Sequence, residues 1–233
     1  MTVVYSNKEK PTKPRQKLDF YPTNKEFCRT VLTRVKENAL CGLVHNRPSL
    51  VLDPGCGNGN WGKELRHVYG DRCSLDGVDI DIQKYMQMDN HLHIYDGVID
   101  HDFLTWETSN RYDLIMGNPP YYIAEEFVEK SHSLLCDTGV LVFLLKLSFV
   151  ESKRRYNKYY SGVELKPDHV WVSTRRLDFF RELGLEGSGD YKAMGVFIWS
   201  KNHKKFHSTY NYEDLRSEDI AYTELDWIDW DYD

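Results

Sequence analysis

The sequence predicts an α/β protein in which helices cover both faces of a mostly parallel sheet. A short apolar run at residues 50–52 is followed by a glycine-rich turn and then by an amphipathic segment at 61–69, which is the order strand, turn, helix. Residues 140–145 form the most apolar run of the chain, and such a run is typical of a central parallel strand covered on both sides. Other apolar runs, each ending in polar residues, alternate with helical patterns.

The elements expected along the chain follow from these patterns. Thr23 or Asn24 is a candidate cap for a helix that extends to about residue 40. Further helices are expected at 61–69 and 125–135, strands at 50–52, 75–78, 98–99, 112–116, 140–145, 169–173 and 193–200, and a turn at 137–139.

Composition narrows the class of protein. A length of 233 residues, with 41% hydrophobic and 28% charged residues, suits a soluble globular chain with one full core. No stretch approaches the ~20 apolar residues that span a bilayer, and the N-terminus has no signal pattern, so no membrane partner is expected. The five cysteines are widely spaced, without a Cys-x-x-Cys pair, which predicts a reducing, cytoplasmic setting. The oligomeric state stays open.

Charge divides the chain into three regions. Residues 1–17 are expected to be a flexible basic lead-in, 18–208 the folded domain, and 209–233 an acidic C-terminal tail with nine acidic residues against one arginine. Trp227 and Trp230 indicate that part of this tail docks on the domain.

The tetrapeptide Asn118-Pro119-Pro120-Tyr121 stands just past the strand expected at 112–116. The carboxyl end of a strand is where open α/β sheets place their chemistry. The two prolines stiffen the backbone. The amide oxygen of Asn118 and the carbonyl of Pro119 are two close acceptors that suit a planar –NH2 group, and Tyr121 offers a face for a planar ring. The alternative is a structural loop with a packed tyrosine.

A second motif, Asp53-Pro54-Gly55-Cys56-Gly57-Asn58-Gly59, joins the first strand to its helix. Alternate glycines let the backbone approach a ligand and turn sharply. A carboxylate facing the pocket would repel a pyrophosphate, but it suits a ligand that carries an ammonium or sulfonium group. The alternative is an ordinary strand-to-helix turn.

Two later acids end strands of the same sheet. Asp79 lies 26 residues past Asp53, close to the spacing at which a carboxylate meets ribose hydroxyls, although a capping role is also open. Asp102 and Phe103 suit the amino group and the ring of an adenine, or else a turn acid beside a buried phenylalanine. Phe20 and Tyr21, placed before the first helix, either staple it or line the pocket.

A basic stretch follows the central strand. Residues 146–181 carry nine basic and four acidic residues with interleaved aromatics, a pattern typical of phosphate contact and base stacking, or of a solvated helix face. The candidate contacts are Lys146, Lys153, Arg154, Arg155, Lys158, Arg175 and Arg176. The overall charge of −6 argues weakly against nucleic acid. No metal is expected, because His91 and His93 lack a third ligand at a suitable spacing.

Together these motifs resemble the phage-type, S-adenosylmethionine-dependent N6-adenine DNA methyltransferases over residues 19–200. The tetrapeptide at 118–121 matches their catalytic motif, in which Asn118 also touches the cofactor, and residues 53–59 match their glycine-rich cofactor loop. The resemblance assigns the remaining cofactor contacts to Phe20, Tyr21, Thr23, Asp79, Ile80, Asp102 and Phe103.

The resemblance implies a Rossmann-like class I methyltransferase fold, with a seven-stranded mixed sheet whose last strand is inserted antiparallel. It implies S-adenosylmethionine as cofactor, the N6 amino group of adenine in DNA as acceptor, and a site in the cytoplasm, of a host cell if phage-encoded. Loose sequence specificity is expected, since only 33 residues follow Ser200. RNA adenine methyltransferases and release-factor glutamine methyltransferases share the tetrapeptide, so both remain alternatives, as does a non-catalytic cofactor-binding module.

Overall fold

The computed structural model describes residues 21–38, 48–82, 93–160, 165–179, 192–201 and 224–231. The expected lead-in and Phe20 lie outside these residues. The strands are β1 (Leu50–Pro54), β2 (Ser74–Asp79), β3 (Gly97–Asp100), β4 (Tyr112–Gly117), β5 (Leu135–Lys146), β6 (His169–Ser173), β7 (Met194–Ser200) and β8 (Glu224–Ile228). The helices and helical turns are α1 (Lys25–Glu37), α2 (Asn60–Tyr69), η4 (Tyr121–Ile123), α4 (Ala124–Leu134), η5 (Leu147–Val150), α5 (Lys153–Arg155) and η6 (Tyr156–Tyr160).

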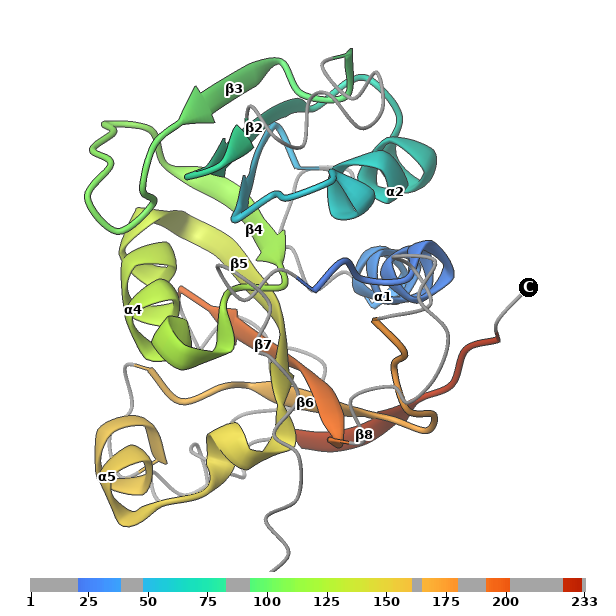
Figure 1. Ribbon diagram of the computed structural model, residues 1–233, viewed down its shortest axis with the longest axis vertical. Coiled ribbons are helices and arrows are strands. Elements are labelled where there is room, and N and C mark those ends of the chain that lie inside the picture. Colours follow the sequence, from blue (N-terminus) through green and yellow to red (C-terminus); the bar gives the residue numbers. More distant parts are fainter. Residues whose placement is uncertain are drawn as a thin grey trace, which may run out of the picture.

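All described strands belong to one sheet with the order β3-β2-β1-β4-β5-β7-β6-β8 (Figure 1). Neighbours from β3 to β5 pair in parallel, whereas β7 runs antiparallel between β5 and β6, as expected. The carboxyl ends of β1, β2 and β4 therefore meet at one edge of the sheet, where the chain order reverses between β1 and β4.

Side chains of the central strand alternate between two cores, one on each face of the sheet. In β5, Val140, Val142 and Leu144 pack with α1 and α2, while the residues between them pack with α4. Figure 1 shows α1 and α2 on one face and α4 on the other, which confirms a sheet covered by helices on both sides. Strict alternation in a continuous apolar run is the consequence of the two-residue period of a strand.

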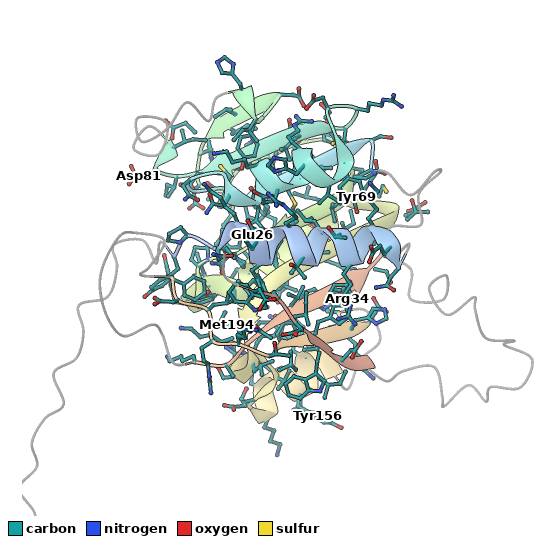
Figure 2. All side chains as sticks on the ribbon, turned by 90° about the vertical axis from the view of Figure 1, so that its right-hand side faces the viewer. Glu26, Arg34, Tyr69, Asp81, Tyr156 and Met194 are labelled. Carbon is teal, nitrogen blue, oxygen red and sulfur yellow. The ribbon has the colours of Figure 1, made fainter. Side chains whose placement is uncertain are left out.

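Helix α1 closes the first of these faces. Asn24 rather than Thr23 caps it, because the Asn24 Oδ1 atom accepts a hydrogen bond from the Phe27 amide at 3.0 Å. Figure 2 shows the helix lying across the sheet, from Glu26 near its start to Arg34 near its end.

Within the described residues the sheet has eight strands, so the expectation of seven was wrong by one. The additional strand β8 comes from the segment that charge assigned to the acidic tail, and it pairs in parallel with β6. Ile228 and Trp230 are buried, and the guanidinium of Arg34 binds Asp226 and the backbone carbonyl of Trp227. The tail therefore docks in part, as its tryptophans indicated.

The turn expected at residues 137–139 is also wrong. These residues belong to β5, at an irregularity in its pairing with β4. Gly139 passes so close to β4 that a Cβ atom there would lie 2.6 Å from the Tyr112 carbonyl oxygen. The glycine permits a close approach of two strands and does not end one.

We expect Trp230→Ala to lower the free energy of unfolding by about 3–5 kcal/mol, measured by urea denaturation. The Trp230 ring is 4% exposed, meets Phe27 edge to face at 5.2 Å, and donates its Nε1–H to Ser173 Oγ at 3.0 Å. Trp227→Ala is the matched control, since that side chain is 61% exposed, and its effect should stay within about 0.5 kcal/mol. Equal effects of the two substitutions would contradict the docking of β8.

Candidate functional site

A cavity opens at the carboxyl edge of β1, β2 and β4, and most of the predicted site residues line it. The predicted residues on its wall are Tyr21, Thr23, Gly55, Gly57, Asp79, Ile80, Asp102, Phe103, Asn118 and Pro120. They come from five separate segments of sequence, of which four lie at or just after the ends of the parallel strands β1 to β4 and one precedes α1. Of the other predicted residues that the structure describes, Asp53, Pro54, Pro119 and Tyr121 lie outside this wall.

The glycine-rich loop is bound to the end of the neighbouring strand. Gly55 and Gly57 have φ angles of +71° and +51°, values that an L-amino acid with a side chain rarely adopts. The Gly55 amide donates to the Val78 carbonyl at 2.7 Å, and the Gly57 amide donates to Asp79 Oδ2 at 2.9 Å. These two bonds hold the loop over the tip of β2.

Asp79 is fixed at the mouth of the cavity by backbone amides. Its Oδ1 atom accepts from the Asp81 amide at 2.9 Å, and its Oδ2 atom accepts from Gly57. Burial raises the pKa of Asp79, while the two backbone hydrogen bonds oppose that shift. A carboxylate held in this way retains acceptor sites for ligand hydroxyls.

Asp102 and Phe103 stand on the α4 side of the same cavity. Asp102 Oδ1 accepts from the Leu104 amide at 2.9 Å, and the Phe103 ring packs 4.9 Å from that of Phe127. The arrangement places a carboxylate next to an aromatic wall, which suits a flat heterocycle with an amino group.

The segment before α1 forms the opposite wall and is tied to two other motifs. The Thr23 carbonyl accepts from Asn60 Nδ2 at 2.7 Å, and its Oγ1 atom accepts from Trp61 Nε1 at 3.2 Å. The Tyr21 carbonyl accepts from Asn118 Nδ2 at 2.8 Å. This short segment therefore joins the start of α2 to the tetrapeptide.

The hydrogen bond to Tyr21 fixes the amide of Asn118. Because the nitrogen donates to that carbonyl, Oδ1 is turned the other way, and it is buried without a hydrogen-bond partner among the described residues. A buried acceptor without a partner is unfavourable unless a ligand satisfies it. Asn118, which lines the cavity, thus carries one acceptor whose hydrogen bond is not satisfied by the described residues.

Aromatic rings gather beside Asn118 on the α1 face of the sheet. Tyr121 stacks on Tyr21, with ring centroids 5.8 Å apart and an angle of 17°, and it meets Phe179 at 6.4 Å. The Lys146 ammonium lies 4.3 Å from the centre of the Tyr121 ring. Lys146, at the end of β5, is therefore a basic candidate that reaches the tetrapeptide.

Asp53 lies behind the loop and not on the wall of the cavity. The residue is 1% exposed, its Oδ2 atom accepts from the Tyr95 hydroxyl at 2.7 Å, and its Oδ1 atom has no partner among the described residues. Burial raises the pKa of Asp53 to about 7, the hydrogen bond from Tyr95 opposes the shift, and the charge of Asp79 adds to it. Its charge is thus sensitive to small changes around it.

Most of the basic candidates are paired with acidic side chains of the chain itself. Arg154 and Arg155 both bind the buried carboxylate of Glu125, and Lys158 binds Glu129. Arg175 binds Asp231 at 2.6 Å, just past β8. Lys153 and Arg176 are exposed.

Several wall residues were not predicted. They are Pro22, Cys56, Asn58, Asn60, Trp61, Val78, Tyr122, Ile123 and Phe127. Most of them belong to a predicted motif or directly follow one, so extending each motif by one helical turn would have predicted them. Tyr95 had no such signal, because it belongs to none of the motifs.

Two features are absent from the part of the chain that the structure describes. No group of three or more His, Cys, Asp or Glu side chains is placed to hold a metal ion. No helix there is long and apolar enough to cross a membrane.

Two curated relatives match part of the chain. The type II methyltransferase M.CvrRI of Paramecium bursaria Chlorella virus XZ-6E is 32% identical over 126 residues, covering 46% of this chain and 32% of the relative. The type II methyltransferase M.TthHB8I of Thermus thermophilus is 29% identical over 162 residues, covering 48% and 35%. The match thus spans about a third of the length of each relative. No family model matches the chain.

Solved structures share the fold. A protein from Pyrococcus horikoshii that is described as an RNA methyltransferase has a TM-score of 0.58 at 15% identity, over 79% of this chain and 88% of that one. The methyltransferase subunit of a type I restriction-modification system from Streptococcus thermophilus has a TM-score of 0.58 at 13% identity, over 78% of this chain and 45% of that one. A protein from Listeria monocytogenes that is described as a class I S-adenosylmethionine-dependent methyltransferase has a TM-score of 0.57 at 13% identity, over 86% of this chain and 64% of that one. The chain has the class I methyltransferase fold, as predicted.

The raised pKa of Asp53 leads to a pH-dependent stability. In the folded protein the Asp53 carboxyl has a pKa of about 7, against a usual value of 3.8. The contribution of the protonated Asp53 to the stability of the fold is therefore complete below about pH 4, and it is lost as the pH rises through about 7. Between these values we expect the free energy of unfolding of the wild type, relative to Asp53→Asn, to fall by about 1.4 kcal/mol per pH unit. Urea denaturation of both proteins across this range measures the difference, and a difference that does not change with pH would contradict the assignment.

Proposed function

We propose that the chain is an S-adenosylmethionine-dependent methyltransferase that methylates the N6 amino group of adenine in DNA. The observation that carries the proposal is the unpaired Oδ1 atom of Asn118 at the edge of a cavity suited to this cofactor. The class I methyltransferase fold and the names of the partial relatives, type II methyltransferases, support it.

The residues that line the cavity support a proposed contact for each part of the cofactor. The carboxylate of Asp79 suits the ribose hydroxyls, and Asp102 with Phe103 suits the adenine amino group and ring. Tyr21 and Thr23 stand on the wall formed by the segment before α1, where the methionine part would lie. The buried Asp53 adds negative charge behind the loop, which favours a cationic ligand.

When bound, S-adenosylmethionine supplies a methyl group that its sulfonium has already activated. The exocyclic amine of adenine is a poor nucleophile, because its lone pair is delocalised into the ring. Asn118 Oδ1 and the Pro119 carbonyl would accept hydrogen bonds from its two N–H groups and favour a tetrahedral nitrogen as the N–C bond forms and the S–C bond breaks. The nitrogen then releases one proton to water. This is positioning combined with electrostatic stabilisation.

The acceptor base has to leave a duplex to reach this position. The Tyr121 ring is the proposed stacking surface, and the base would displace one of its present neighbours, Tyr21 or Lys146. Lys146 is proposed to contact a phosphate of the same nucleotide. The other basic candidates are proposed as contacts to the DNA backbone, with Arg154 foremost because its side chain is 72% exposed.

The first test is transfer of radiolabelled methyl groups from S-adenosylmethionine to unmethylated DNA and, in parallel, to total RNA. The proposal expects N6-methyladenine in DNA, and mapping the modified positions tests the expected loose specificity. Label in RNA alone would replace DNA by RNA as substrate. Bound cofactor without label in either nucleic acid would overturn the proposal in favour of a protein substrate or a non-catalytic module.

We expect Asn118→Ala to lower kcat by at least ~100-fold, since the acceptor for the amine is lost. Asp102→Ala is the contrasting variant, because it removes a contact on the adenine side of the cavity and leaves the amide in place. It should raise KM for the cofactor by about tenfold, with a smaller change in kcat. If both variants lose only cofactor affinity, Asn118 is not catalytic.

Two adjacent arginines should behave differently. Arg154→Ala should lower the salt slope of DNA binding by about 1 and leave stability unchanged, as expected for one phosphate contact. Arg155 is 27% exposed, donates to the Ser148 carbonyl at 3.0 Å and lies over the Phe149 ring. Arg155→Ala should therefore lower the free energy of unfolding by about 1–3 kcal/mol. Binding titrations at several salt concentrations and urea denaturation measure the two effects, and an unchanged salt slope would exclude Arg154 as a contact.

A further inference from the structure

A tyrosine outside every predicted motif is in direct contact with the cofactor loop. Tyr95 lies just before β3, is 9% exposed, and donates its hydroxyl to Asp53 Oδ2 at 2.7 Å across 42 residues of sequence. It supplies the only side-chain hydrogen bond to this carboxylate among the described residues. Asp53 is the first residue of the glycine-rich loop, so a change in the position of Tyr95 would alter the start of that loop.

The Tyr95 ring fits into a narrow slot between two glycines. A Cβ atom on Gly62, in the first turn of α2, would lie 2.6 Å from the Tyr95 hydroxyl oxygen, and one on Gly77, in β2, would lie 2.8 Å from Tyr95 Cδ1. Gly77 is also the residue that pairs with Asp53 between β2 and β1. Two glycines from different elements thus leave space for one aromatic ring, and the slot ends at Asp53.

The other oxygen of Asp53 faces the tetrapeptide. A Cβ atom on Gly117, the residue before Asn118, would lie 3.1 Å from Asp53 Oδ1. The carboxylate therefore stands between the cofactor loop and the catalytic motif, with Tyr95 as its support. Asp79 is the other titratable group whose charge acts on Asp53, and it supplies no positive charge.

We propose that Tyr95 is a positioning residue for the cofactor, holding the Asp53 carboxylate at the junction of the two motifs so that its negative charge attracts the sulfonium and ammonium groups. The inference rests on the proposed cofactor. A phenol that donates to a carboxylate favours its ionised form, whereas burial disfavours it. Without Tyr95 the carboxylate would have no side-chain donor.

The proposal gives cofactor affinity a specific pH dependence. A cationic ligand binds better once Asp53 is ionised, so the affinity should rise as the pH increases through the pKa of Asp53, about 7. Removing the Tyr95 hydroxyl raises that pKa further, because a bond to the ionised form is lost. The rise in affinity should then occur at higher pH.

The experiment measures the Kd of S-adenosylmethionine by calorimetry between pH 5.5 and 9 for the full chain, for three single variants and for the double variant that combines Tyr95→Phe with Asp53→Asn. Tyr95→Phe keeps the ring and removes the hydroxyl. Tyr112→Phe is the matched control, because the Tyr112 hydroxyl donates to Asp76 Oδ2 at 2.9 Å in the same sheet but away from the cavity. Asp53→Asn shows how much of the pH dependence belongs to the titration of the cofactor itself.

We expect Tyr95→Phe to raise Kd about tenfold at pH 7.5 and to move the pH midpoint upward, and Tyr112→Phe to change neither. In the Asp53→Asn background the Tyr95→Phe substitution should have no further effect on the pH midpoint. A Tyr95→Phe protein with the Kd and pH profile of the wild type would overturn the inference and leave the proposed function intact. A wild type that fails to bind S-adenosylmethionine would overturn both.

Discussion

The hydrogen bond from Asn118 Nδ2 to the Tyr21 carbonyl fixes the orientation of the amide, whose Oδ1 atom is buried without a partner among the described residues. An asparagine side chain has one donor end and one acceptor end, so satisfying the donor leaves the acceptor available. The bond spans 97 residues of sequence, and it requires the segment before α1 to lie against the end of β4. That segment is itself held by Asn60 and Trp61 at the start of α2. The orientation of the proposed catalytic group thus depends on contacts made by α2.

A second constraint acts behind the glycine-rich loop, where the Asp53 carboxylate is buried with a single side-chain donor among the described residues. Burial of an ionised carboxylate is unfavourable, and the protein compensates only in part through Tyr95. A fully compensated carboxylate would be a stable ion, insensitive to what binds nearby. Partial compensation leaves Asp53 able to respond to a cation in the cavity. We infer that some stability is given up here in return for affinity for a positively charged ligand.

Much of the fold could be predicted from the sequence, because its signals are local. The alternation of strands and helices, the two motifs at strand ends and the doubly covered strand at 140–145 all depend on neighbouring residues. The convergence of eight of the ten predicted residues on one cavity then follows from parallel pairing, whereas Tyr21 and Thr23 are brought there by the segment before α1. What could not be predicted depends on distant partners. In the sequence Gly139 predicts a turn, and only its contact with the Tyr112 carbonyl explains the glycine. The roles of Gly62 and Gly77 likewise depend on the Tyr95 ring, which packs against both.

The charged residues show the same limit most clearly. Counting charges along the chain separates a basic stretch from an acidic tail, yet the two meet in space where Arg175 binds Asp231. Arg34 likewise binds Asp226 across 192 residues of sequence, and so holds β8 against α1. Arg154 and Arg155 share one buried carboxylate on α4, the helix that continues from the tetrapeptide. A guanidinium that satisfies a buried acid is part of the fold, and it can contact a phosphate only where, as for Arg154, another cation already neutralises that acid.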